Sequence, residues 1–198
     1  MPRAGLTRAA VVELGAQLAD EVGFDRLTLA GVAARVGVRL PSLYKHVGGL
    51  DDLHREVAVL AGGEVAQELR TAAVGLAGGD ALRALAVAYR AYARAHPGRY
   101  AAAQRAPAPD DDEHARAASA VVEVVFAVLR GYGLAGEELV HATRILRSSL
   151  HGFVALEAAG GFGLPESVDE TFARLVEGLD TALRALASPA GAASAVSR

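Results

Sequence analysis

Apolar residues recur every three or four positions along almost the whole chain, and strict alternation of apolar and polar residues is hard to find. A period near 3.6 places apolar side chains on one face of an α-helix, whereas a half-buried strand needs a period of two. The pattern is clear at residues 80–96, 137–158 and 167–187. The sequence therefore predicts an all-α fold of about nine helices, and its 198 residues can bury a real hydrophobic core.

Capping residues divide the first fifty positions into short helices. Thr7 and Gly23 suit the N-cap and C-cap of a first helix, and Thr28 and Gly37 suit those of a second. Pro41 fits the first turn of a third helix running to about residue 47, because its missing N–H costs nothing there.

Residues 28–47, TLAGVAARVGVRLPSLYKHV, predict a helix-turn-helix. Ala33 is small enough for close helix packing, and Gly37 can make the sharp turn. Such a pair lays its second helix into the major groove of DNA. Short helix pairs with a glycine turn also occur in proteins that do not bind DNA, so spacing alone leaves a structural role open. The expected small core consists of Val32, Val36, Leu43 and Val47.

The wider stretch LTLAGVAARVGVRLPSLYKHVGGLDDL resembles the DNA-binding domain of the tetracycline-repressor (TetR) family over roughly residues 5–55, with its L-x-x-V-A-x-x-x-G-V core and L-Y-x-H end. The run LRSSLHGFVALE at 146–157 looks like a ligand-domain helix of one TetR subgroup. The resemblance implies a DNA-binding domain at 1–50 and a helical ligand-binding and dimerisation domain at 51–187. Residues 188–198, rich in small residues, are expected to form a disordered tail.

The resemblance implies that Tyr44 and His46 bind backbone phosphates, and an O–H and an N–H can each donate to an anionic oxygen. Arg39 and Lys45 have the donors that recognise guanine, while Leu40 and Pro41 can only contact a thymine methyl group. Tyr44 as a partly buried residue and His46 as an ordinary surface residue stay open as alternatives. The predicted DNA contacts are Thr28, Arg39, Leu40, Pro41, Ser42, Tyr44, Lys45 and His46.

Charge is unevenly distributed along the chain. The net charge is −3, yet residues 1–49 hold six Lys/Arg and four Asp/Glu. A mildly basic N-terminal part followed by an acidic remainder of the chain fits a local anion-binding surface rather than a protein that coats nucleic acid. Many TetR relatives have a lysine at the start of the fourth helix, where this chain has Leu50. The sequence therefore predicts moderate DNA affinity with a shallow salt dependence.

The last two predicted helices have continuous apolar stripes. Two such helices from each of two subunits can form a four-helix bundle across a two-fold axis, although the same stripes could be core within one subunit. A two-fold operator needs a dimer, which favours the interface. The predicted dimer residues are Leu139, Leu146, Leu150, Phe172, Leu175, Leu179 and Leu183.

The polar face of 137–158 either contacts solvent or lines a ligand cavity with aromatic walls. The candidate ligand residues are Tyr89, Tyr92, Phe126, Arg147, His151 and Phe153, and each aromatic among them also suits a core. The predicted function is a repressor released from double-stranded operator DNA by a small molecule, whose binding tilts the fourth helix. A helical adaptor, or a family member that no longer binds operators, is the alternative.

Several other classes are excluded or disfavoured. The chain has no cysteine, so disulfides and thiol chemistry are impossible. It lacks G-x-S-x-G and G-K-[ST] signatures, so neither an enzyme nor a cofactor is expected, and an enzyme on an all-α scaffold is only a third hypothesis. The acidic run at 110–114 could attract a metal, but acids at a helix N-terminus explain it better. No apolar run is long enough for a membrane span, which predicts a cytoplasmic protein.

Overall fold

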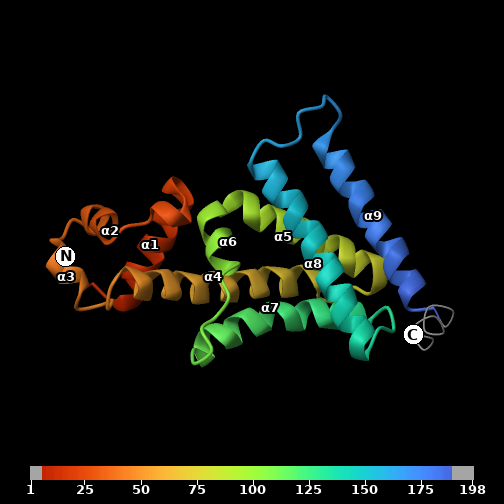
Figure 1. Cartoon of the computed structure of the whole chain (residues 1–198), viewed down its shortest axis with the longest axis horizontal. Coiled ribbons are helices and arrows are strands. Elements are labelled where there is room, and N and C mark those ends of the chain that lie inside the picture. Colours follow the sequence, from red (N-terminus) through yellow and green to blue (C-terminus); the bar gives the residue numbers. More distant parts are fainter. Residues whose placement is uncertain (1–5, 189–198) are drawn as a thin grey trace. The chain divides into compact units, whose positions relative to one another are not determined.

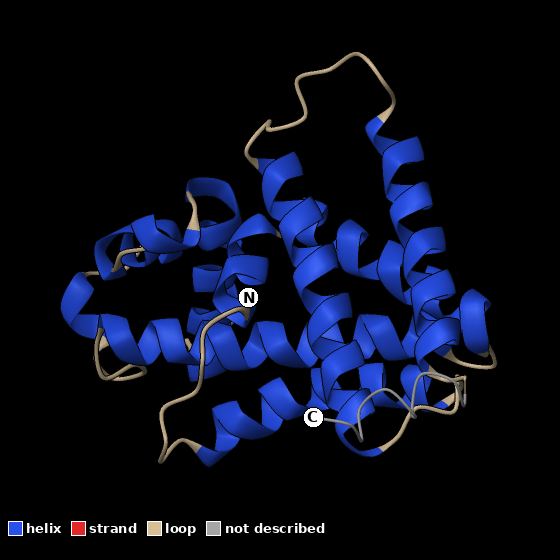
Figure 2. Cartoon of the chain, turned by 45° about the vertical axis from the view of Figure 1, so that its right-hand side comes forward, coloured by secondary structure: helices blue, strands red, loops and turns tan. Residues whose placement is uncertain are grey.

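The computed structural model describes residues 6–188, which form helices and connecting turns without any strand (Figures 1 and 2). The described part therefore confirms the predicted all-α fold of about nine helices. Most of the predicted tail, at 189–198, lies outside the described residues. The helices are α1 (Arg8–Val22), the 3-10 turn η1 (Phe24–Arg26), α2 (Leu29–Val36), α3 (Leu40–Leu43), α4 (Leu50–Ala73), α5 (Gly78–Ala95), α6 (Pro97–Ala103), α7 (Asp112–Arg130), α8 (Gly136–Ala158) and α9 (Val168–Leu186).

The chain divides into two compact units. The first, called the head below, comprises the described residues up to Ala66 together with Tyr92–Val121. The second comprises Gln67–Ala91 together with the described residues from Val122 on. Helix α6 thus packs with the head, although it lies far along the chain from α1. The functional boundary at residue 50 stays a prediction.

The predicted caps of the head are confirmed. The Thr7 hydroxyl accepts a hydrogen bond from the Ala10 N–H at 3.2 Å, and the Thr28 hydroxyl accepts one from the Gly31 N–H at 3.0 Å. Gly37 has a φ of +75°, the left-handed conformation that glycine adopts at little cost. Each cap satisfies backbone groups that a helix end leaves unpaired.

Helix α3 is shorter than predicted. Regular helix ends at Leu43, and a turn continues to His46, whose N–H donates to the Leu43 carbonyl at 2.8 Å. That bond spans three residues rather than four, the tighter geometry that often ends a helix. The predicted extension of the helix to residue 47 was therefore wrong by about one turn.

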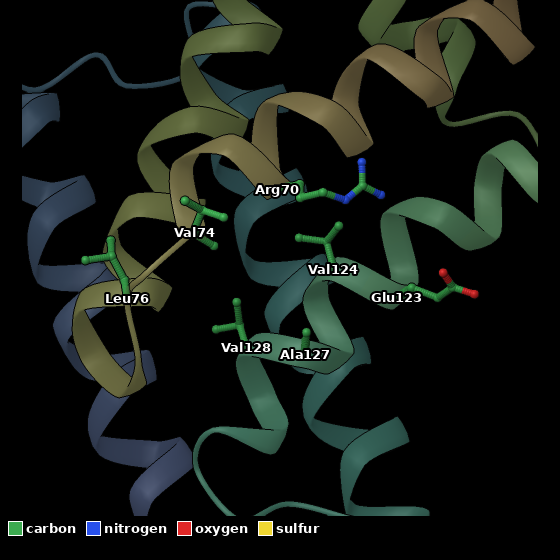
Figure 3. A pocket seen from close by; sticks show the side chains of 8 residues that line it. Arg70, Val74, Leu76, Glu123, Val124, Ala127 and Val128 are labelled. Carbon is green, nitrogen blue, oxygen red and sulfur yellow. The ribbon is translucent and has the colours of Figure 1, made fainter.

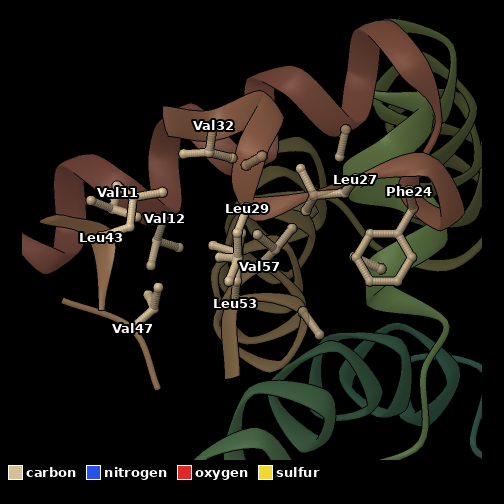
Figure 4. Close-up of a cluster of buried hydrophobic side chains, with 14 of the residues drawn as sticks. Val11, Val12, Phe24, Leu27, Leu29, Val32, Leu43, Val47, Leu53 and Val57 are labelled. Atoms are coloured by element: carbon tan, nitrogen blue, oxygen red, sulfur yellow. The ribbon is translucent and has the colours of Figure 1, made fainter. Parts of the chain in front are cut away.

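The head has its own hydrophobic core, to which α1, α2, α3 and α4 all contribute (Figure 4). Val32, Leu43 and Val47 are buried and Val36 is partly buried, so the predicted core of the helix-turn-helix is confirmed. The largest buried side chains of this core are Val11, Val12, Phe24, Leu27, Leu29, Val32, Leu43, Val47, Leu53 and Val57.

In the second unit, α8 and α9 form an antiparallel pair connected by residues 159–167 (Figure 1). The ring of Phe153 lies 5.0 Å from that of Phe172. Arg90 of α5 packs over the Phe172 ring at 4.7 Å and donates to Glu157 at 2.8 Å. A buried guanidinium is costly unless it is paired, and here a carboxylate and an aromatic face both stabilise it.

Candidate functional site

Seven of the eight predicted DNA-contacting residues lie together at 39–46, called the recognition segment below, and the eighth, Thr28, lies at the start of α2. Arg39, Tyr44 and Lys45 are exposed, and Tyr44 keeps 56% of its surface accessible. Leu43 and Val47, on the other side of the segment, are buried in the head core. Tyr44 is therefore more exposed than buried and is not part of the head core. Of the remaining predicted contacts, Thr28, Leu40 and Pro41 are exposed and Ser42 and His46 are half-buried.

Thr28 combines two roles without conflict. Its oxygen accepts the capping hydrogen bond from the Gly31 N–H. Because that bond uses a lone pair, the hydroxyl proton can still be donated to a phosphate oxygen.

Arg8 of α1 binds the last residue of the recognition segment, His46. The sequence did not predict this contact. Its Nη1 donates to the His46 carbonyl at 2.7 Å, and its Nη2 donates to Asp52 Oδ1 at 2.9 Å and lies 3.0 Å from Glu56 Oε1. Asp52 also accepts from the Gly48 N–H at 2.7 Å. Although burial opposes it, these hydrogen bonds lower the pKa of Asp52. The first turn of α1 is therefore tied both to the turn that follows α3 and to α4, and no sequence motif signals such a contact.

The second unit has a groove beside the end of α4 (Figure 3). Its volume is about 320 Å³, and it lies between α4, the chain that follows α4, and α7. Val74 is 75% exposed and Leu76 is 47% exposed, so the groove presents apolar side chains to solvent. Arg70 and Glu123 supply its charged groups. The lining residues are Arg70, Ala73, Val74, Leu76, Glu123, Val124, Ala127 and Val128.

None of the six predicted ligand residues lines this groove. Tyr92 belongs to the head, where its hydroxyl donates to Glu64 at 2.7 Å, while the other five belong to the second unit. Phe153 is buried against Phe172. Of the other four, Tyr89 is buried, Phe126 and His151 are half-buried and Arg147 is exposed. The six therefore do not form one cluster within a unit, and their role in ligand binding stays a prediction.

Comparisons with known proteins identify the family. Residues 82–179 match the tetracyclin repressor-like, C-terminal domain family. The HTH-type transcriptional regulator Rv0681 of Mycobacterium tuberculosis is 41% identical over 158 residues, covering 79% of this chain and 72% of that protein. The HTH-type transcriptional regulator YobS of Bacillus subtilis is 34% identical over 171 residues, covering 86% of this chain and 88% of that protein. This chain belongs to the TetR family.

The solved structures agree on the fold of this TetR-family protein. A TetR variant from Acinetobacter baumannii, in complex with minocycline, superposes with a TM-score of 0.68 at 21% identity, covering 93% of this chain and 99% of that one. TetR-family proteins regulate transcription by binding DNA and are not enzymes. The predicted subgroup stays a prediction. No described helix of this regulator is long and apolar enough to cross a membrane.

The predicted dimer residues of this TetR-family regulator lie in the core of its own second unit. Six of them (Leu139, Leu146, Leu150, Phe172, Leu179 and Leu183) are buried, and Leu175 is half-buried. The burial of these six side chains within one protomer fits the alternative of core within one subunit, and their role in a dimer stays a prediction. An apolar stripe looks the same in sequence whichever helix covers it.

The acidic run at the start of α7 pairs with a cation from α4. Arg55 donates from Nε and Nη2 to the two oxygens of Asp111, at 2.8 and 2.7 Å, and from Nη2 to Glu113 at 2.7 Å. Asp111 also accepts from the His114 N–H at 3.0 Å, which caps the helix. Across residues 6–188, no group of three or more His, Asp or Glu side chains is arranged to hold a metal ion.

Proposed function

We propose that this TetR-family regulator is a homodimeric repressor that contacts operator DNA through residues 39–46 and releases it when a small apolar molecule binds the second unit. The observation that supports DNA contact is that some basic side chains of the head pair with carboxylates while those of the recognition segment pair with none in the described part of the chain. Arg8 and Arg35 pair with carboxylates. Arg39 and Lys45 are exposed, and neither makes an ion pair with a described residue. Their charges are therefore available for phosphates or guanine edges.

Selection of bound sequences from random DNA, followed by binding titrations, tests this proposal. We expect Arg39→Ala to weaken binding to the selected operator by about 1–3 kcal/mol and to relax the sequence preference at one base pair. Arg35→Ala is a matched control, because Arg35 is occupied by Glu21 at 2.6 Å. Failure of the wild type to select any sequence would favour the adaptor alternative.

The dimer interface is proposed on the outward faces of α8 and α9. Gly152 and Gly178 lie inside these helices, and a Cβ at either position would meet no described heavy atom within 4 Å outside the helix backbone. A glycine inside a helix costs up to about 1 kcal/mol relative to alanine, and packing within the protomer does not explain it. Close approach of a helix from a second copy of the chain would explain both glycines. Ile145 and Leu156 are exposed on α8 and would add apolar area.

The groove beside α4 is the proposed effector site. Its volume of about 320 Å³ lies at the lower end of the range for small-molecule pockets, and its exposed Val74 and Leu76 favour an apolar ligand. The A. baumannii neighbour, in complex with minocycline, gives one example of this fold with a small molecule. Because Arg70 and Ala73 belong to α4, a ligand here would contact the helix whose tilt is proposed to separate the two recognition segments.

A thermal-shift screen of apolar metabolites tests the effector site. Compounds that stabilise the wild type should not stabilise Ala127→Trp, whose indole would fill the groove. Val87→Trp is the control, because Val87 is an exposed valine of α5 that does not line the groove. Loss of the shift in Phe126→Ala but not in Ala127→Trp would assign binding to the predicted aromatic residues instead.

A further inference from the structure

The N-terminus of α6 is capped by a side chain from another helix. Its own N-cap residue, His96, makes no side-chain capping bond. Instead, Asp20 of α1 accepts a hydrogen bond at Oδ1 from the Arg99 N–H, at 2.8 Å. The first N–H groups of a helix have no partner within it, and a carboxylate there is also favoured by the helix dipole. Asp20 therefore supplies from α1 the cap that α6 lacks.

The backbones of α1 and α6 touch at the neighbouring position. A Cβ at Gly98 would lie 2.1 Å from the backbone carbon and oxygen of Ala19. Only glycine permits that approach. The first turn of α6 is thus held on the last turns of α1 by a steric fit and by a hydrogen bond, at adjacent residues.

Arg99 extends this contact into the rest of the head. It is 8% exposed, and its guanidinium donates to Glu13 of α1 at 2.7 Å and to Glu64 of α4 at 2.8 Å. Its Nε lies 3.1 Å from Asp20 Oδ2. Burial opposes the charge, but the Glu13 hydrogen bond and the surrounding carboxylates raise the pKa of Arg99. Withdrawal of α6 would leave all three carboxylates without this cation, so the contact should be made or broken as a whole.

Helix α1 carries a second contact at its other end, where Arg8 donates to the carbonyl of His46 in the recognition segment. Arg8 and Asp20 are twelve positions apart, a distance of about 18 Å along a straight helix. The same helix therefore holds the recognition segment at one end and α6 at the other.

We infer that Asp20 is a positioning residue for DNA binding: by fixing α6 on α1, it sets the position of α1 and hence of the recognition segment. Docking of α6 and binding of DNA are then reciprocally coupled, so each stabilises the other. The inference rests on DNA binding by residues 39–46 but not on any effector.

Amide hydrogen exchange on the full-length protein, with and without the operator selected from random DNA, tests the coupling. We expect operator binding to slow exchange in residues 97–104, and Asp20→Ala to remove that protection and weaken operator binding by about tenfold. Glu21→Ala is the control, because this neighbouring carboxylate pairs only with Arg35 on α2 among the described residues. It should leave both readouts close to those of the wild type.

Asp20→Asn covers the case in which the alanine variant fails to fold. Its amide oxygen can still accept from the Arg99 N–H, so the cap persists while the charge beside Arg99 is lost, and we expect intermediate protection and affinity. Unchanged exchange in residues 97–104 when the wild type binds its operator would overturn the coupling alone. Absence of any operator binding by the wild type would overturn the proposed function and the coupling together.

Discussion

At the scale of single residues, two helical glycines differ in the space around them. One lies in α6 and the other in α4. Gly98 lies where the backbone of α6 meets Ala19, whereas Gly63 in α4 faces space in which a Cβ would meet no described atom within 4 Å. The first glycine is required by a close contact. The second has no such contact among the described residues, and glycine there lowers the helix propensity of α4.

We therefore expect Gly98→Ala to destabilise the protein by about 1–3 kcal/mol or more, because the backbone atoms of Ala19 cannot rotate away from the added methyl group. Gly63→Ala should instead stabilise it by up to about 1 kcal/mol. Denaturant unfolding of both variants measures the free energies. Equal effects of the two substitutions would contradict the backbone contact between α6 and α1.

Leu50 begins α4 and is partly buried against the head core, at the position where the resemblance to the TetR family implies a lysine. Leu50→Lys should steepen the dependence of the logarithm of the operator binding constant on the logarithm of salt concentration by about one unit, because one more phosphate would be neutralised. Binding titrations across a salt series measure this slope. An unchanged slope would show that no phosphate lies near the start of α4.

At the scale of helices, α4 and α7 are joined by the ion pair of Arg55 with Asp111. The hydrogen bonds from Arg55 and from the His114 N–H hold the pKa of Asp111 well below its usual range. A carboxyl group whose pKa is lowered by folding adds stability above its unfolded pKa of about 4 and loses it as the pH falls toward the folded value.

Asp111→Asn should therefore reduce the unfolding temperature at pH 7, and the difference from the wild type should shrink as the pH falls from about 5 to 2. Thermal unfolding at a series of pH values measures this. Asp110→Asn is the control, since the exposed Asp110 makes no ion pair among the described residues. Parallel pH curves for the wild type and Asp111→Asn would contradict the contribution of the pair.

At the scale of the whole molecule, the proposed dimer depends on the open faces around Gly152 and Gly178. An arginine at either position should leave the helix content of the protomer unchanged and dissociate the dimer, because its side chain would occupy the space of the partner helix. Loss of the dimer should also lower operator affinity, since two half-sites would no longer be bound together.

Sedimentation equilibrium of Gly152→Arg and Gly178→Arg measures the oligomeric state. Gly63→Arg provides a control with an equally open glycine in α4, and it should remain dimeric. Dimers that persist in both α8 and α9 variants would place the interface on another surface of the protein.

Local chemistry was predictable from the sequence. Thr7, Thr28 and Gly37 have the predicted roles because a cap involves atoms only three or four residues apart. The predicted ligand residues show the limit of this reasoning. Tyr92 and Phe153 are equally plausible as pocket aromatics in sequence, yet Tyr92 belongs to the head and Phe153 packs in the core of the second unit.

The sequence by itself determined most of the helices, the local caps of α1 and α2 and the exposure of Arg39, Tyr44 and Lys45, because helical period and capping by neighbours are short-range properties. Only the tertiary structure decided that the stripes of α8 and α9 are buried within one protomer, that a groove follows α4, and that Asp20 caps α6 across 79 positions. An apolar stripe specifies that a helix face is covered but not by which element, and a carboxylate does not specify its distant partner. Those choices are made by the packing of the whole chain.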